Sequence, residues 1–159
     1  MMVSWKEFAT ENPELAEIGE NLLFQFGVGL AFLATVREDG GPRLHPICPV
    51  LSNGRLFVLI VPGSPKRYDL IRDGRFALQA FPPPREESEE FYITGRAEHV
   101  EDSQIRQSVF KDAKHRAGED EEFFELKVER VMHTAWENWG TPECGPVHKK
   151  WWASGGTRL

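Results

Sequence analysis

The chain has 159 residues, of which 40% are hydrophobic and 28% are charged, and its formal net charge at pH 7 is -6. This size and composition fit one soluble globular domain, and no apolar run is long enough for a membrane-spanning helix. An acidic chain also lacks the broad basic surface that nucleic-acid binding needs. Residues 1–6 lack the basic and apolar regions of a secretory signal, so we expect a cytoplasmic protein.

Two helices are expected in residues 4–26. Ser4 and Glu7 have the spacing of a capping box, and Asn12 followed by Pro13 is typical of a helix start. After Pro13, apolar side chains recur at helical spacing opposite a glutamate-rich face. We expect this second helix to cover the core of a sheet.

Residues 29–82 predict three strands joined by two tight turns. Asp39-Gly40 and Asn53-Gly54 are strong hairpin signals, because these residue types accept the positive φ that such turns need. The strands are expected at residues 30–36, 43–51 and 55–61. Consecutive strands are therefore expected to be neighbours.

The second of these strands contains Pro46 and Pro49. Proline cannot donate to the hydrogen-bond ladder of a sheet, so it marks a sheet edge or a bulge. An edge leaves backbone groups free to contact a planar ligand.

A cationic loop follows the third strand. Ser64, Lys66 and Arg67 lie between that strand and a short helix that ends near Asp73. A hydroxyl group, an ammonium group, a guanidinium group and the free N–H groups of a helix start suit a phosphate. Residues 64–75 carry four cations and two anions in a chain whose net charge is negative. An ordinary solvated turn is the alternative interpretation.

The rest of the chain predicts strands at residues 75–81, 91–100 and 123–136, and a helix from residue 103 to about 116. Six strands in hairpin order, with few helices, predict a mainly-β fold: a six-stranded antiparallel Greek-key barrel with flanking helices. We expect a single domain over residues 1–159. It has N-terminal helices in 4–26, a barrel in 29–136 and an irregular tail in 137–159.

Several short motifs of the barrel region together resemble the pyridoxamine 5'-phosphate oxidase-like, FMN-binding split-barrel superfamily. The motifs are Ala34-Thr35-Val36, Asp39-Gly40, Pro42-Arg43-Leu44-His45-Pro46, Asn53-Gly54-Arg55-Leu56-Phe57, Gly63-Ser64-Pro65-Lys66 and the stretch 70–77. The resemblance implies a split barrel that forms a homodimer, with two FMN molecules in clefts between the subunits.

The resemblance also implies a set of cofactor-binding residues. The second strand would line the isoalloxazine ring, the third strand would add two residues, and the Ser-x-Lys phosphate site of the family falls on Ser64 and Lys66. Among the tryptophans we favour Trp136 for the cofactor cleft and the tail for the partner subunit. The expected residues are His45, Pro46, Ile47, Cys48, Leu59, Ile60, Ser64, Lys66, Arg67 and Trp136.

Three departures separate the chain from the vitamin-forming oxidases of this family. Those enzymes have a lysine where the chain has Cys48 and a glutamine where it has Glu90, and a tyrosine on their substrate-binding helix is absent from residues 103–116. We therefore interpret the chain as a general member whose substrate is unknown. Cys48 is expected to be a small buried side chain rather than a nucleophile.

The leading hypothesis is an FMN-dependent oxidoreductase in which no residue is identified as catalytic. A deazaflavin-dependent reductase is one alternative, because related barrels bind that cofactor with the same loop. A non-catalytic flavin or haem carrier is another, and His45, His133 and His148 are the candidate ligands of a haem iron. The five histidines show no metal-ligand spacing, so we predict no metal site.

Overall fold

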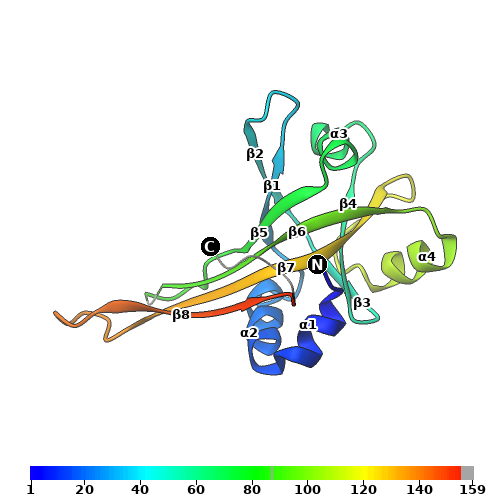
Figure 1. The fold of residues 1–159 in the computed structure, drawn as a ribbon. Coiled ribbons are helices and arrows are strands. Elements are labelled where there is room, and N and C mark those ends of the chain that lie inside the picture. The colour runs from blue at the N-terminus through cyan, green and yellow to red at the C-terminus, as the bar shows by residue number, and fades with distance from the viewer. Residues whose placement is uncertain (87, 155–159) are drawn as a thin grey trace.

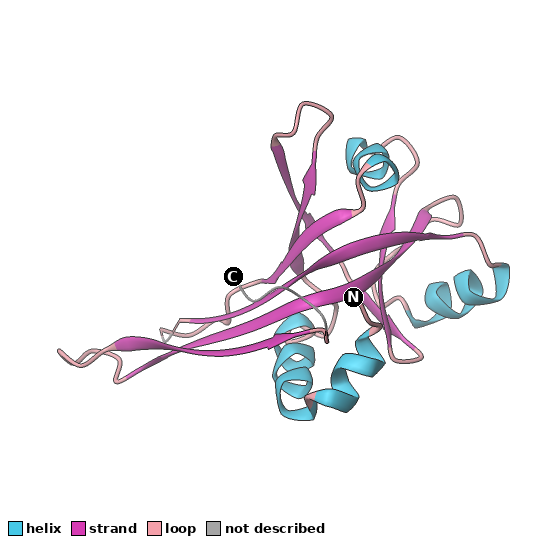
Figure 2. Ribbon diagram, in the orientation of Figure 1, coloured by secondary structure: helices cyan, strands magenta, loops and turns pink. Residues whose placement is uncertain are grey.

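The computed structural model describes residues 1–86 and 88–154. Within them an antiparallel sheet of eight strands is flanked by four helices (Figures 1 and 2). The mainly-β split-barrel class is confirmed, with eight strands in place of six. The strands are β1 (Ala31–Val36), β2 (Pro42–Ile47), β3 (Val50–Ser52), β4 (Arg55–Ile60), β5 (Arg75–Ala80), β6 (Glu89–Val100), β7 (Glu122–Glu137) and β8 (Gly145–Trp152). The helices are α1 (Trp5–Glu11), α2 (Pro13–Leu23), α3 (Pro65–Arg72) and α4 (Ser103–Asp112).

Both predicted tight turns are present. Asn53 and Gly54, with φ of 48° and 70°, connect β3 to β4, and Gly40, with φ of 81°, lies in the turn between β1 and β2. The capping box of α1 and the Asn12 cap of α2 are also formed. These local signals position the hairpins and helices as the sequence indicated.

The predicted second strand, residues 43–51, is wrong in one respect: the structure divides it at Cys48 and Pro49. β2 pairs with β1 as far as Ile47, whereas β3 pairs with β4 from Val50 onward. Pro49 has no N–H for a ladder, and its carbonyl packs so closely on Gly29 that a Cβ there would lie 2.1 Å from the oxygen. The chain therefore leaves one end of the sheet and joins the other.

This division leaves the barrel open along one line. The strand order is β2-β1-β5-β6-β7-β4-β3, so β2 and β3 are the two ends of the path. β3 pairs with β4 only at residues 55–57. In the described part of the chain, the outer edge of β2 and the edge of β4 beyond Phe57 consequently have no strand partner.

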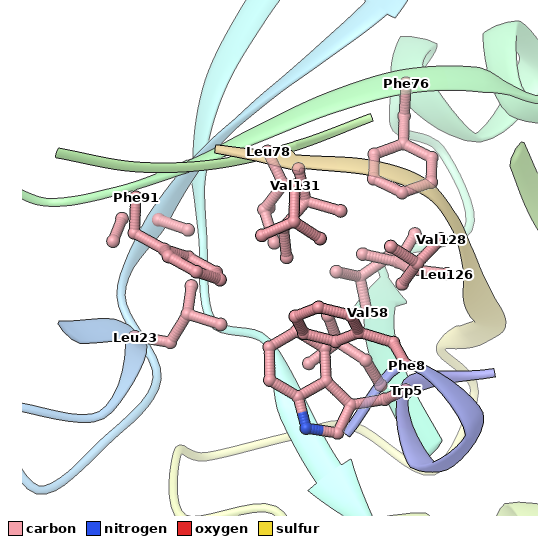
Figure 3. Close-up of a cluster of buried hydrophobic side chains, with 14 of the residues drawn as sticks. Trp5, Phe8, Leu23, Val58, Phe76, Leu78, Phe91, Leu126, Val128 and Val131 are labelled. Carbon is pink, nitrogen blue, oxygen red and sulfur yellow. The ribbon is translucent and has the colours of Figure 1, made fainter. Parts of the chain in front are cut away.

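The main hydrophobic core lies between the sheet and the two N-terminal helices. Trp5 and Phe8 of α1 and Leu23 of α2 pack against apolar side chains of β4, β5, β6 and β7 (Figure 3). A second, smaller core joins β3, β4 and β7 to α4. The two helices cover the sheet as expected, although α2 ends at Leu23 rather than near residue 26.

The expected irregular tail, residues 137–159, contains a strand. β8 pairs with the second half of β7, and together with the start of β6 they form an arm that projects from the barrel (Figure 1). The base of this arm is held to the helices, since the Trp151 indole donates to Glu11 at 3.2 Å and Lys149 pairs with Glu14. The last part of the predicted tail, 155–159, lies outside the described residues, as does Glu87. No helix within the described ranges is long and apolar enough to cross a membrane.

Phe91 of β6 offers a test of the main core. Its ring is fully buried, 6.2 Å from the Trp5 ring, and fits against Gly19, where an added Cβ would lie 2.2 Å from it. Phe91→Ala is therefore expected to lower the free energy of unfolding by about 3–5 kcal/mol. Phe110→Ala, at a position that is 40% exposed, should cost less than about 1 kcal/mol. Urea denaturation measures both, and similar losses in the two variants would contradict the assignment of the core.

Candidate cofactor site

The cationic loop leads into α3. Ser64 is the N-cap residue and Pro65 occupies the first helical position, where the missing N–H of proline costs nothing. The Ser64 side chain makes no capping hydrogen bond although the residue is only 8% exposed. Pro65 has no N–H, and the N–H of Arg67 donates to the Ser64 carbonyl at 3.0 Å. Among the described residues, the start of α3 thus presents the Lys66 N–H and the Ser64 hydroxyl group without a capping bond.

Lys66 lies on the first turn of α3 and is half-buried. Its ammonium group forms no ion pair and no hydrogen bond within the part of the chain that the structure describes. Burial lowers the pKa of Lys66, and the negative charge of Glu121 opposes that change only in part. The structure therefore holds a partly desolvated positive charge without a direct partner.

Arg67 differs from Lys66 because it already has a partner. Its guanidinium group pairs with Glu122 at 3.2 Å and lies over the Tyr68 ring, 5.2 Å from the centroid. The second Glu122 oxygen lies 2.6 Å from Nε2 of His99. A role for Arg67 at the phosphate stays a prediction, and it would require Arg67 to be shared with Glu122.

Asp69, one turn after Lys66, is a buried carboxylate that connects α3 to β1 and β2. Its Oδ2 accepts hydrogen bonds from Oγ1 of Thr35 at 2.8 Å and from Nε of Arg43 at 2.7 Å. Burial alone would raise the pKa of Asp69, but the hydrogen bonds from Arg43, Thr35 and Arg72 outweigh it and lower the pKa. Asp69 is thus held as an anion.

Arg43 is a residue that the sequence reasoning missed. Alternation along β2 places Arg43, His45 and Ile47 on the half-buried face of the strand, while Leu44 and Pro46 lie on the exposed face. The available signal in the sequence was that Arg43 lies two residues before His45, because residues two apart on a strand lie on the same face. The structure brings Arg43 to α3, whereas Pro46 lies on the opposite face.

His45 and Cys48 approach the cationic loop from β2. Burial lowers the pKa of His45, and the positive charges of Lys66 and Arg43 lower it further. The pKa of Cys48 is raised by burial and by the charge of Glu121, which also acts on Lys66. Ionisable groups at the end of β2, at the start of α3 and in the segment before β7 therefore affect one another's pKa.

Leu59 and Ile60 pair with β7 along one edge of β4, and among the described residues the other edge has no strand partner at this point. Their side chains pack elsewhere. Ile60 packs in the main core and Leu59 in the smaller one, at 1% and 4% exposure. What β4 offers a ligand at this point is backbone rather than side chain.

Trp136 is the one predicted site residue that a single chain does not bring to the others. It lies near the tip of the arm, 37% exposed, with its ring 6.5 Å from that of Trp139. Along β7 it is about 45 Å from Glu122, at roughly 3.3 Å per residue. Within one chain Trp136 therefore lies far from the cationic loop.

One hollow of the surface is lined by other residues than this loop. A hollow of about 410 Å³ beside α4 is lined by Ser103, Arg106, Gln107, Phe110, Glu119 and Phe123. Among the described residues, no three His, Cys, Asp or Glu side chains gather as a metal site.

The family model described as Pyridoxamine 5'-phosphate oxidase matches residues 24–135, well over half of the sequence. The chain belongs to this family. No match is found among curated proteins. The matched region includes the whole cationic loop, β2 and β4, whereas Trp136 lies one residue beyond it.

Solved structures of similar fold include the heme binding protein of Mycobacterium smegmatis, with 17% identity and a TM-score of 0.59 over 80% of this chain and 56% of that one. HutZ, the heme storage protein of Vibrio cholerae, has 18% identity and a TM-score of 0.55 over 74% and 89%. General Stress Protein 26 of Bacillus anthracis has 18% identity and a TM-score of 0.55 over 74% and 93%. The chain spans little more than half of the M. smegmatis protein. At these identities the likeness shows the fold alone.

The thiol of Cys48 provides a test of the local electrostatics. In a Cys144→Ser variant, Cys48 is the only remaining thiol. Its alkylation by iodoacetamide is expected to keep accelerating above pH 9, because the thiolate reacts and the pKa is raised above the ordinary value of 9.0. Adding Glu121→Gln removes a repulsive charge and should move the midpoint to lower pH. A rate that levels off below pH 9 would contradict this description.

Proposed function

We propose that this member of the pyridoxamine 5'-phosphate oxidase family binds FMN and is an oxidoreductase with an unidentified substrate. The observation that carries the proposal is the unpaired, half-buried ammonium group of Lys66 at the start of α3, next to the unused hydroxyl of Ser64. Bound FMN would supply the redox chemistry, and the protein would bind and orient it.

The charge of Lys66 supports a phosphate ligand. Burying a charge is costly unless it is paired and hydrogen-bonded, and Lys66 has neither compensation from the described residues. A phosphate carries about -1.5 to -2 charges at pH 7 and accepts several hydrogen bonds. The ammonium group and the backbone N–H of Lys66, together with the Ser64 hydroxyl, match those requirements.

The open line of the barrel supports a planar ring. The outer edge of β2 and the edge of β4 beyond Phe57 carry backbone N–H and C=O groups without strand partners. These groups lie on either side of the chain's bend at Cys48. A flavin ring placed there would be contacted by His45 and Cys48 from β2, while Leu59 and Ile60 would contribute backbone.

We infer a homodimer because a second copy would cover that open line. The arm projects away from its own barrel and carries the exposed rings of Trp136 and Trp139 at its end, where they suit contact with another surface (Figure 1). Sedimentation at micromolar concentration is expected to show a dimer, and Trp136→Ala should weaken both the dimer and FMN binding. A stable monomer would leave each site without its second wall and would contradict the inference.

Lys66→Ala tests the phosphate site. Charge-assisted hydrogen bonds contribute about 1.5–3 kcal/mol each, so FMN affinity should fall about ten- to a hundred-fold. Riboflavin lacks the phosphate, so its affinity should hardly change. Quenching of flavin fluorescence measures both ligands on both proteins.

The control is Lys111→Ala, at an exposed position in the last turn of α4, which should leave both affinities unchanged. A destabilised cleft would weaken FMN and riboflavin equally in the Lys66 variant. If FMN affinity is unchanged in that variant, the cationic loop is a solvated turn and the proposal is wrong.

Haem is the second candidate, and one observation favours it. His133 is bonded to Glu89 at 2.8 Å and His148 to Thr134 at 2.9 Å, whereas His45 has no hydrogen bond among the described residues. Burial and nearby cations lower the pKa of His45 and favour the neutral imidazole that ligates iron. Two proteins of similar fold, the heme binding protein of M. smegmatis and the heme storage protein HutZ, agree with this candidate. The absorption spectrum of the purified protein distinguishes haem, flavin and deazaflavin.

A further inference from the structure

We propose that Asp69 is the positioning residue of the cofactor site: it fixes the start of α3 relative to β2, so that Lys66 and His45 face one ligand. The inference rests on the proposed function and adds to it a residue that contacts no ligand. It concerns how the phosphate site keeps its shape rather than which groups bind the phosphate.

Asp69 bridges three elements through one carboxylate. It is 2% exposed, and its Oδ2 accepts from Thr35 of β1 and from Arg43 of β2. Its Oδ1 lies 3.4 Å from Nη2 of Arg72, which also donates to the carbonyl of Val36 at the end of β1. α3 is thereby attached at two points to the hairpin of β1 and β2.

This bridge connects the two parts of the site, which are Lys66 on α3 and His45 on β2. Asp69 is three residues after Lys66, so both lie on one side of α3 a turn apart. Arg43 is two residues before His45 on the same face of β2. Because β2 is an edge strand paired only with β1, the bond from Arg43 to Asp69 is its side-chain link to α3.

The bridge also explains why Lys66 stays without a partner. Asp69 is the acidic residue of α3, and its oxygens are occupied by Thr35, Arg43 and Arg72. Two cations on one buried carboxylate leave no negative charge on α3 for Lys66. The arrangement therefore keeps Lys66 available while holding it in place.

A positioning role makes a selective prediction. In Asp69→Ala the start of α3 is no longer tied to β2, so FMN affinity should fall about ten-fold, while riboflavin affinity should stay within about three-fold of wild type. A residue that only stabilised the fold would affect both ligands alike. Fluorescence titration of FMN and riboflavin provides the two numbers.

The matched control is Asp73→Ala at the other end of the same helix. Asp73 pairs with Arg75 next to it and makes no bond to β1 or β2 among the described residues. Its removal should leave the affinities for FMN and riboflavin unchanged. Equal FMN losses in the Asp69 and Asp73 variants would overturn the proposal.

Asp69→Asn separates geometry from charge and serves if the alanine variant does not fold. Both close hydrogen bonds reach Oδ2, and one amide oxygen in that place can accept both. FMN affinity should therefore remain within about three-fold of wild type. A loss of about ten-fold or more, with riboflavin unaffected, would show that Asp69 acts through its charge and would overturn the positioning role.

The outcomes distinguish this inference from the proposed function. Wild-type protein that does not prefer FMN to riboflavin overturns the phosphate site and, with it, the role of Asp69. Wild-type protein that prefers FMN, combined with an Asp69→Ala variant that keeps this preference, overturns the role of Asp69 alone.

Discussion

The bend at Cys48 and Pro49 is the constraint on which the rest of the arrangement depends. It transfers the chain from an edge strand at one end of the sheet to the short strand at the other end. As a result, two strand edges have no strand partner in the described part of the chain. The tight contact between Gly29 and the Pro49 carbonyl fixes this bend against the loop after α2. Exposed edges usually invite aggregation, and a ligand or a partner that covers them removes that risk.

Most of the charged side chains near the open line of the barrel are paired with a charge of opposite sign. Glu125 of β7 is buried and pairs with Arg55 and Lys127, so its negative charge is compensated. Arg67 is likewise paired with Glu122. Against this background Lys66 is unusual, because in an acidic chain it has no ion pair with any described residue where the barrel is open. The position of the Lys66 charge therefore says more about a possible ligand than the net charge of the chain does.

Features that depend on neighbouring residues could be predicted from the sequence. The turns at Gly40 and Asn53, the cap at Ser4 and the cationic loop before α3 all follow from a few adjacent residues, whose backbone preferences and hydrogen-bonding groups are local. The mainly-β class also followed from the succession of short apolar runs and turns. This is why the fold could be expected before its topology was known.

Features that depend on distant residues could not be predicted. The division of the second strand depends on which strands β2 and β3 find as partners, and the sequence shows two prolines without showing this choice. β8 carries lysines and tryptophans without clear alternation, and it becomes a strand because β7 offers an edge. The link from Asp69 to Thr35 and Arg43 spans 34 and 26 residues, respectively, beyond the reach of any short motif.

The central place of β7 has a consequence for biosynthesis. β7 pairs with β6 on one side and with β4 and β8 on the other, and Val3 near the N-terminus forms a bridge to its Val128. Because β7 begins at Glu122, β4 and β6 are both synthesised before this neighbour is available to them. Until then both strands present free edges and apolar faces, the state in which nascent β proteins are most vulnerable to misassembly. Closure of the barrel therefore depends on the strand that comes after both of its neighbours β4 and β6 in the sequence.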